Sequence, residues 1–338
     1  MTDQANVQCV LVNRPKGVAQ AQDFKLVAGD MPDPAEGEIQ VRNHFLSVEP
    51  AMRGWIADTG NYSAPVGIGE VMRALAAGEV ITSRHPDYRP GDWVTGWFGW
   101  QEIATVPASK VVRKVTESDL PLSASLGILG INGVTALLAL TKVGQPKAGD
   151  TVVVSTAAGA VGSAVGQIAK ILGCRTVGIA GGTRKVRACL EDFGFDASID
   201  YKAGPIDAAL KAACPSGIDV YFDNVAGAVS DAVYRQLALR ARVVVCGTAS
   251  VADWTDWPSG PRVERILLTQ RARMEGFIIF DHPADYEGAV ARLAGWVRDG
   301  RLTYREDILE GMEACPDALA GLYRGENEGK RLIRLVPT

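Results

Sequence analysis

Two glycines stand in a run of small residues where the backbone could bind an anion. Gly159 and Gly162 lie in the segment 156–162, which joins an apolar run to a helical pattern. Residues without side chains let the backbone turn sharply and approach a phosphate, and the first amides of the following helix would point at that phosphate. The pattern predicts a site for the pyrophosphate of a dinucleotide. The spacing is not a strict Gly-x-Gly-x-x-Gly, so these glycines have an alternative explanation, which is tight packing of a helix on a strand.

Basic and hydroxyl side chains follow the next apolar run. Thr183, Arg184 and Lys185 come directly after Gly181 and Gly182. Enzymes that bind NAD usually carry Asp or Glu here, where the carboxylate accepts a hydrogen bond from the ribose 2′-hydroxyl. An acid would repel a 2′-phosphate, whereas cations and hydroxyls bind it through charge-assisted hydrogen bonds. We therefore predict NADP rather than NAD; the alternative is two ordinary solvated cations at a helix start.

The residues around both segments form a strand–helix–strand unit. Residues 151–155 are a short β-branched apolar run, typical of a buried parallel strand. Apolar residues follow at helical spacing over 163–172, Gly173 is a signal for the end of a helix, and 175–180 repeats the strand pattern. This unit would place the glycines at the start of the helix and the basic residues after the second strand.

Strand and helix patterns continue to alternate toward residue 299 and predict a doubly wound parallel sheet. Further strands are expected at 197–201, 218–222, 242–246 and 274–280, and helices at 206–213, 229–239 and 283–299. Such a sheet binds its ligand at the carboxyl ends of its strands. The residues expected there are Tyr201, Asn224, 246–250 and 277–280. The polar and aromatic loop 253–260 is interpreted as a flap or a dimer element.

The first part of the chain predicts a separate domain of short strands. Strand patterns at 7–12, 38–43, 78–83 and 92–98 are separated by turn signals, which is typical of a β-barrel or partial barrel. A last strand at 331–336 is expected to return to it. We therefore assign residues 1–125 and 306–338 to a β domain and 126–305 to a nucleotide-binding domain of an α/β protein. Its tryptophans, Trp55, Trp93, Trp97 and Trp100, would line an apolar pocket or fill the β core.

Composition limits the classes of partner. The 338 residues carry a formal net charge of −4, and 47% of them are hydrophobic. That balance is ordinary for a soluble globular protein, and neither a nucleic acid nor a membrane partner is expected. The sequence shows no secretory signal pattern and no apolar run long enough to span a bilayer, so we expect a cytoplasmic protein.

Cysteine and histidine usage argues against a metal site. The six cysteines form no Cys-x-x-Cys pair, and the three histidines, His44, His85 and His282, are scattered. No combination has the spacing of zinc ligands. We therefore expect no metal site and no disulfide framework.

The order of the domains and five strings resemble the zinc-independent branch of the medium-chain dehydrogenase/reductase superfamily. The strings are VEPAMRG at 48–54, IGEVM at 68–72, AAGAVGS at 157–163, FDNV at 222–225 and GENEGK at 325–330. The branch includes leukotriene B4 dehydrogenases (prostaglandin reductases), plant alkenal double-bond reductases and bacterial curcumin reductases. The resemblance covers nearly the whole chain, and it implies a GroES-like β-barrel domain, a Rossmann domain and a homodimer.

The resemblance also implies NADPH-dependent reduction of the C=C bond of α,β-unsaturated ketones or aldehydes. Without a metal to polarise an oxygen, conjugate addition of hydride from NADP(H) is the easier reaction, because hydrogen-bond donors can stabilise the enolate. By the match, the pyrophosphate would contact Gly159, Ala160, Val161 and Gly162, and the 2′-phosphate would contact Lys185 and Tyr201. The rest of the cofactor would contact Asn224, Cys246, Gly247, Thr248, Ala249, Ser250, Phe277, Ile278, Ile279 and Asn327.

Two departures from the family pattern leave the catalytic donor open. Ala51 and Phe280 stand where eukaryotic members carry tyrosines. Tyr62 is the substitute candidate; alternatively, it is a packed tyrosine, and water or the cofactor ribose delivers the proton. Asn224 and Asn327 also have structural alternatives, as an Asx-turn residue and a loop cap.

Two other functions are compatible with these residues. One is a quinone or carbonyl oxidoreductase on the same scaffold, and the other is a non-catalytic NADPH-binding protein. Consumption of NADPH with a panel of enones would exclude the non-catalytic protein. Analysis of the product, with either C=C or C=O reduced, would separate the two enzymes.

Overall fold

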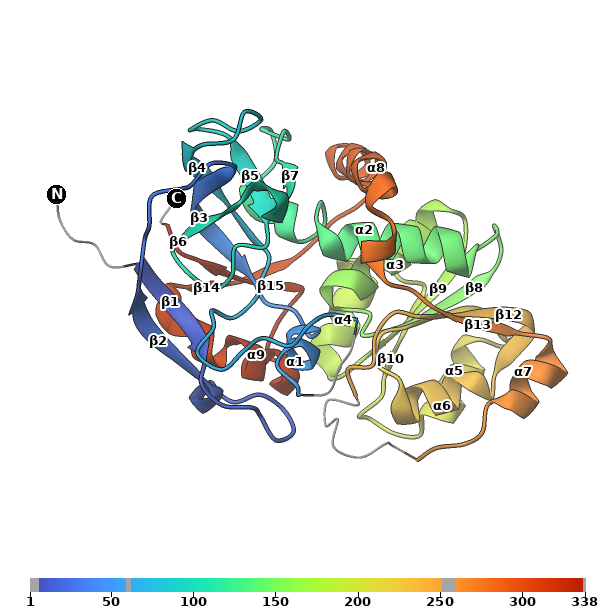
Figure 1. The fold of residues 1–338 in the computed structure, drawn as a ribbon. Helices are drawn as coiled ribbons and strands as arrows, with labels where there is room; N and C mark the ends of the chain where they lie inside the picture. The colour runs from blue at the N-terminus through green and yellow to red at the C-terminus, as the bar shows by residue number, and fades with distance from the viewer. Residues whose placement is uncertain (1–5, 59–61, 251–258, 337–338) are drawn as a thin grey trace. The chain divides into compact units, whose positions relative to one another are not determined.

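The computed structural model describes residues 6–58, 62–250 and 259–336 (Figure 1). These residues divide into two compact units. The first contains the described residues of Met1–Leu126 and Glu306–Thr338, and the second those of Gly127–Val251 and Asp256–Arg305. Each unit is built on a sheet of its own.

The first unit is a mostly antiparallel sheet. Its described strands run in the order β14–β15–β3–β4–β5–β7, and β6 pairs with β3. The bounds are β3 (Glu38–Ser47), β4 (Ala76–Ser83), β5 (Trp93–Gly96), β6 (Ile103–Pro107), β7 (Val111–Lys114), β14 (Glu306–Glu310) and β15 (Lys330–Arg334). This unit also contains an antiparallel pair of strands, β1 (Asn6–Leu11) and β2 (Phe24–Gly29). Its α-helices are α1 (Met52–Trp55) and α9 (Cys315–Arg324), and short 3-10 helices connect other elements.

The C-terminal strand completes the sheet of the first unit. Leu332 pairs with Ser47 and Ile333 pairs with Leu46 in antiparallel register. The side chains of Leu332, Ile333 and Leu46 are fully buried, so the last strand contributes to the core of a sheet formed by the start of the chain. The expected return of the last strand is confirmed, although the strand begins at Lys330.

The second unit is a parallel sheet in the order β10–β9–β8–β11–β12–β13. The bounds are β8 (Thr151–Ser155), β9 (Arg175–Ala180), β10 (Ala197–Asp200), β11 (Ile218–Asp223), β12 (Leu237–Val245) and β13 (Arg273–Gly276). The helices are α2 (Ile131–Ala139), α3 (Ala160–Ile171), α4 (Thr183–Glu191), α5 (Ile206–Ala213), α6 (Gly227–Tyr234), α7 (Glu264–Gln270) and α8 (Tyr286–Arg298). Figure 1 shows α2 and α3 on one face of this sheet and α5 and α6 on the other.

The order of these strands confirms the predicted doubly wound fold. The chain runs outward from β8 through β9 to β10, and then returns to place β11 on the other side of β8. All five residues of β8 are buried, as expected for a strand covered by helices on both faces. The strand order reverses between β8 and β11, and ligands of such sheets bind at the carboxyl ends of the strands at this point.

The expected helix at 229–239 is wrong in its second half. Helix α6 ends at Tyr234, and β12 begins at Leu237. The run from Leu237 to Leu239 has residues that favour a helix, but Leu237 pairs with Ile218 of the neighbouring strand. Pairing in the sheet therefore overrides the local preference.

The expected strand at 274–280 is too long. Strand β13 ends at Gly276, and Ile279–Asp281 forms a 3-10 turn. The backbone N–H of Phe277 still donates to the carbonyl of Val245, but the chain then folds back and the ring of Phe277 stacks on His282. The stacked rings have centroids 4.9 Å apart and an interplanar angle of 8°. Burial of Phe277 and Ile279 is achieved by this turn rather than by a longer strand.

One sequence interpretation falls partly outside the described residues. Most of the loop at 253–260 does so, since the description resumes at residue 259, and its interpretation as a flap or dimer element stays a prediction. The first five residues also lie outside it. In the part of the chain that is described, no helix has the length and apolar character needed to cross a membrane.

Candidate functional site

The turn between β8 and α3 has the geometry of an anion-binding segment. Thr156 adopts a positive φ of 53°, and its carbonyl accepts a hydrogen bond from the backbone N–H of Gly159. Gly159 is the N-cap of α3 in an extended conformation, and no side chain caps this helix. The helix thus begins at Ala160 with its N-terminal amides directed to the carboxyl end of β8, where they favour a negatively charged ligand.

The glycines of this turn also have a packing role. A Cβ atom on Gly162 would lie 2.3 Å from the carbonyl oxygen of Thr156, and one on Gly166 would lie 2.0 Å from the ring of Phe195. Neither distance is compatible with a side chain, so α3 approaches the turn and the neighbouring loop only because these positions are glycines. Tight packing and phosphate binding are therefore compatible explanations of the same residues.

A carboxylate that the sequence reading missed lies at the ends of β9 and β10. The side chain of Asp200 accepts hydrogen bonds from the backbone N–H groups of Gly182, at 2.9 Å, and Lys202, at 3.0 Å. Gly182 is the N-cap of α4 and has a φ of 90°. The bond from Gly182, followed by that from Lys202, lowers the pKa of Asp200, so this side chain is ionised. Asp200 ties the turn after β9 to the turn after β10.

The same two strand ends bring Tyr201 and Lys202 to Gly181. A Cβ atom on Gly181 would lie 2.8 Å from Cε1 of Tyr201 and 3.1 Å from Cε of Lys202. The ammonium of Lys202 lies 5.8 Å from the centre of the Tyr201 ring. Lys185 is half-buried in the first turn of α4. The residue after β9, where NAD enzymes usually carry an acid, is therefore covered by a phenol and a lysine side chain.

Asn224 lies at the reversal point of the sheet and is held by Ser155. Its backbone N–H donates to the hydroxyl of Ser155 at 2.8 Å, and its Nδ2 donates to the carbonyl of Ser155 at 2.7 Å. The Asx turn that was considered for Asn224 belongs to its neighbour, since Oδ1 of Asp223 accepts from the backbone N–H groups of Val225 and Ala226, both at 2.9 Å. Asn224 instead links the ends of β8 and β11.

Asp223 organises this end of the sheet, and sequence reasoning did not single it out. Its buried carboxylate accepts hydrogen bonds from the hydroxyls of Ser230, at 2.7 Å, and Tyr221, at 3.1 Å. Burial, together with the negative charge of Asp223, raises the pKa of Tyr221, which therefore stays protonated as a donor. The FDNV string contained the signal, because an acid at the end of a buried strand must find donors for its oxygens.

The segment 246–250 packs on this loop. The backbone N–H groups of Cys246 and Gly247 donate to the carbonyl of Asp223, and Ala249 and Ser250 donate to the next two carbonyls of that loop. A Cβ atom on Gly247 would lie 2.9 Å from the carbonyl oxygen of Asn224. The structure thus brings Asn224 together with 246–250, as the doubly wound sheet predicted. Burial raises the pKa of the Cys246 thiol to about 12, so this cysteine is a neutral, unreactive thiol.

Tyr62 in the first unit is 53% exposed, so it is not a core tyrosine. Its hydroxyl oxygen accepts a hydrogen bond from the indole N–H of Trp55 at 3.2 Å. Trp55 is buried and packs edge-on against Trp97, with ring centroids 5.6 Å apart. The indole N–H donates a hydrogen bond to this oxygen, and the Tyr62 hydroxyl keeps its own hydrogen as a donor.

The tryptophans of the first unit serve mainly as core residues. Trp55 and Trp100 are buried in the hydrophobic core, and Trp100 also donates from its indole N–H to the carbonyl of Ser47. Trp97 is partly buried against the same core, whereas Trp93 is 38% exposed and packs against His44. The core explanation therefore holds for Trp55 and Trp100.

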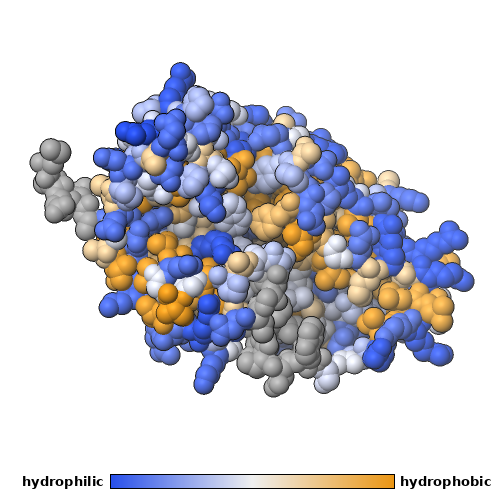
Figure 2. Space-filling view, in the orientation of Figure 1, coloured by the Kyte–Doolittle hydropathy of each residue, from blue (hydrophilic) through white to orange (hydrophobic). Residues whose placement is uncertain are grey.

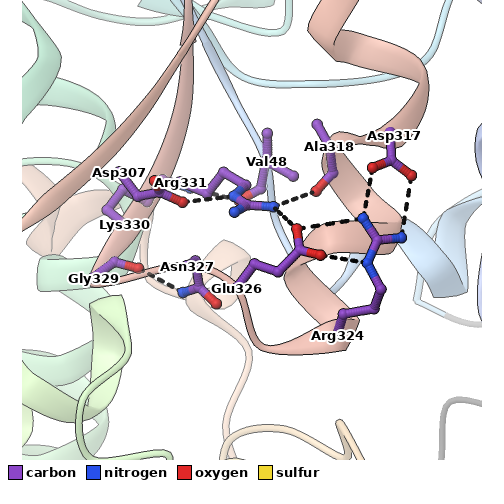
Figure 3. A network of polar contacts seen from close by, with 10 residues as sticks. All are labelled: Val48, Asp307, Asp317, Ala318, Arg324, Glu326, Asn327, Gly329, Lys330 and Arg331. Carbon is purple, nitrogen blue, oxygen red and sulfur yellow. Dashed lines mark hydrogen bonds and ion pairs between the residues drawn. The ribbon is translucent and has the colours of Figure 1, made fainter. Parts of the chain in front are cut away.

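Asn327 lies in the loop between α9 and β15, and a polar network surrounds this loop (Figure 3). Its Nδ2 donates to the carbonyl of Gly329 at 2.8 Å, which is the loop-cap contact considered from the sequence. Glu326, its neighbour, forms ion pairs with Arg324 and with the buried Arg331. Arg331 is also paired with Asp307 of β14 at 2.7 Å. These contacts fix the position of the loop and of Asn327.

Lys330 connects two of the strings, 48–54 and 325–330, which stand near opposite ends of the sequence. Its buried ammonium donates to the hydroxyl of Ser47, the carbonyl of Val48 and the carboxylate of Glu49, at 2.7, 2.9 and 2.6 Å. Figure 3 shows Lys330 beside Asp307 at one end of the network around Asn327. Burial lowers the pKa of Lys330, and the ion pair with Glu49 opposes that shift. The sequence reading did not predict this pair.

Comparison with known proteins identifies the family. A model described as the N-terminal domain of oxidoreductase matches residues 7–115, and one described as zinc-binding dehydrogenase matches 160–295. An NADPH-dependent curcumin reductase of Escherichia coli is 42% identical over 338 residues, with 98% of each chain covered. The chain belongs to the medium-chain dehydrogenase/reductase family. It is therefore an oxidoreductase, as the resemblance implied.

Other members of the medium-chain dehydrogenase/reductase family match over the same length. The NADP(+)-dependent 2-alkenal reductase of Nicotiana tabacum is 36% identical over 335 residues, with 97% of each chain covered. The crystal structure of CurA from Vibrio vulnificus in complex with NADPH has a TM-score of 0.92 and 41% identity, and the match covers 98% of this chain and 100% of that one. Although one family model has zinc in its name, no group of three or more His, Cys, Asp or Glu side chains in the described ranges could hold a metal ion.

Proposed function

We propose that the protein is an NADPH-dependent reductase of the C=C bond of α,β-unsaturated ketones and aldehydes. The observation that carries the choice of cofactor is the end of β9, where Tyr201 and Lys202 cover Gly181 and the carboxylate of Asp200 is engaged by the backbone N–H groups of Gly182 and Lys202. The full-length relatives named as curcumin and 2-alkenal reductases support the reaction type. The same relatives are named for NADPH or NADP(+), in agreement with the chemistry of this strand end.

The residues of the second unit fit the cofactor that we propose. Gly159, Ala160, Val161 and Gly162 would hold the pyrophosphate at the uncapped start of α3, where the amides face an anion. Lys185 and Tyr201 would bind the 2′-phosphate. The remaining contacts would come from the segments that Asp223 holds together and from the end of β13. They are Asn224, Cys246, Gly247, Thr248, Ala249, Ser250, Phe277, Ile278 and Ile279, with Asn327 from the first unit.

The chemistry requires a donor for the substrate carbonyl. NADPH, when bound, supplies the hydride for the β-carbon of the substrate. Negative charge then develops on the carbonyl oxygen, and a hydrogen-bond donor at that oxygen lowers the barrier. The side chains of Phe280 and Ala51 carry no polar atom, whereas the Tyr62 hydroxyl accepts a hydrogen bond from Trp55 and is itself a donor. We therefore assign the donor role to Tyr62, on the unit that we propose as the substrate domain.

We also propose that the protein is a homodimer that pairs through β13. This strand is the last of the parallel sheet, and its outer edge has no neighbour among the described strands. Leu268 of α7 is 77% exposed and Leu239 of β12 is 54% exposed. Figure 2 shows hydrophobic side chains gathered over the end of the second unit where α7 lies. A second copy would cover the edge and these leucines. A cytoplasmic location stays a proposal, supported by six free cysteines.

The experiment that tests the function is a steady-state assay with a panel of enones, enals and quinones. Each substrate is offered with NADPH and, separately, with NADH. We expect enones and enals to be reduced to saturated ketones and aldehydes, with preference for NADPH. The saturated ketone and the allylic alcohol have the same mass, so the products are identified by NMR against authentic standards. Formation of allylic alcohols, or turnover of quinones alone, would contradict the proposal.

A further inference from the structure

Two charged side chains lie where β9 and β10 end, and a third, Lys185, belongs to the helix that follows β9. Lys202 follows β10 directly, and its Cε would lie 3.1 Å from a Cβ atom on Gly181, the first residue after β9. Its methylene groups therefore pass over the backbone of the neighbouring strand end. Asp200, the last residue of β10, accepts from the backbone N–H groups of Gly182 and Lys202. Lys185 belongs to the helix that starts after the turn at Gly182.

The balance of charge at this place favours a dianionic group. Asp200 contributes one negative charge, which is engaged by two backbone N–H groups, and Lys202 and Lys185 contribute two positive charges. Lys202 is exposed, so its ammonium is accessible to a ligand at this strand end. A phosphate with a second pKa near 6 carries close to two charges at neutral pH and accepts hydrogen bonds on three oxygens.

We infer that Lys202 is a specificity residue that binds the 2′-phosphate of NADP together with Lys185 and Tyr201. Asp200 is a positioning residue, because it anchors the backbone of Lys202 to the turn that carries Gly182. This inference rests on the proposed cofactor site and adds two residues to it. Gly181 is part of the same arrangement, since any side chain there would displace Tyr201 and Lys202.

The contact between Lys202 and the 2′-phosphate can be measured without catalysis, by binding of the adenosine half of the cofactor. The probes are 2′,5′-ADP and 5′-AMP, which differ by the 2′-phosphate, and the affinities of the full-length protein are measured by titration calorimetry. Lys202→Met keeps the apolar stem and removes the charge. We expect about a 3- to 10-fold weaker affinity for 2′,5′-ADP, with little change for 5′-AMP, since the lost contact is one charge-assisted bond at an exposed site. Lys211→Met on α5, another exposed lysine of the same unit, is the matched control.

Substitutions of Asp200 test the positioning role. Asp200→Asn keeps an oxygen that accepts from Gly182 and Lys202, and we expect it to retain the preference for 2′,5′-ADP. Asp200→Ala removes that oxygen and should weaken 2′,5′-ADP binding. If Asp200 acts through Lys202, the double variant Asp200→Ala, Lys202→Met should bind 2′,5′-ADP as tightly as the single variant with the lower affinity. The two losses of affinity would then not add, because the two residues act as one unit.

The outcomes separate this inference from the function it rests on. An unchanged preference in Lys202→Met, with a selective loss in Lys185→Ala, would overturn the role of Lys202 and leave the cofactor site in place. Equal losses for both probes in Lys202→Met would also overturn it. A wild-type protein that binds 2′,5′-ADP and 5′-AMP equally would instead contradict the cofactor site itself.

Discussion

Removal of one oxygen atom, in Tyr62→Phe, tests the proposed catalytic donor. The ring of Tyr62 is 53% exposed and its hydroxyl accepts from the indole of Trp55 at 3.2 Å. The substitution keeps the ring and its contacts and removes only the hydroxyl. Its effect on turnover therefore reports the donor, provided that the fold is unchanged.

The exposure of Tyr62 sets the size of the expected effect. A donor in a dry oxyanion site is worth about 10²–10³ in kcat. A half-exposed hydroxyl can be replaced in part by water, so its net hydrogen bond is worth about 0.5–1.5 kcal/mol, which corresponds to a factor of about 2 to 13 in rate. We expect kcat to fall within that range for several enones, while the KM for NADPH changes by less than about twofold.

A stability measurement separates the two roles of the hydroxyl. Tyr62→Phe also takes an acceptor from the indole of Trp55, and a buried donor left unsatisfied costs about 1–3 kcal/mol. Thermal unfolding of the variant shows whether water replaces that acceptor. Tyr201→Phe serves as the matched control, since the same atom is removed from the nucleotide unit and should affect the KM for NADPH rather than kcat. Full kcat in Tyr62→Phe across the panel would refute the donor role.

Four other predictions concern the cofactor, the metal, the assembly and the buried ion pair. Lys185→Ala should raise the KM for NADPH about 10- to 100-fold and barely change that for NADH, since a charge-assisted bond is worth about 1.5–3 kcal/mol; equal effects on both cofactors would argue against this site. Prolonged treatment with a chelator should leave activity and thermal stability unchanged, and stoichiometric zinc in elemental analysis would contradict the prediction. Light scattering at micromolar concentration should give the mass of a dimer, whereas a monomer mass would count against pairing through β13. Lys330→Met should destabilise the fold by about 3–5 kcal/mol in urea unfolding, because Glu49 would be left as a buried charge, and Lys330→Met, Glu49→Gln should recover part of that loss. A neutral effect of Lys330→Met would show that Glu49 finds another partner.

The sequence by itself predicted the parallel sheet because its signals are local. Residues 151–155 and 175–180 are continuous apolar runs, and strands β8 and β9 have those same bounds. Burial on both faces requires such runs, and turn residues bound them. The order of the segments along the chain was then enough to place Asn224 and 246–250 at one end of the sheet. The same logic missed Leu237 and misjudged the strand after Gly276, where pairing and stacking partners lie elsewhere in the chain.

Contacts between distant segments were decided only by the tertiary structure. Lys330 and Glu49 form a buried ion pair although 281 residues separate them, and neither string alone indicates a partner. Asp200 and Lys202 lie at the proposed cofactor site only because β10 pairs with β9 and the last residues of the two strands, Asp200 and Ala180, are opposite each other. In the sequence, Asp200 is an acid that precedes a tyrosine. Nothing there indicates that it accepts a hydrogen bond from the backbone N–H of Gly182, which lies 18 residues earlier. Local composition indicated most of the elements, whereas register and strand order determine which of their ends can share a charge or a hydrogen bond.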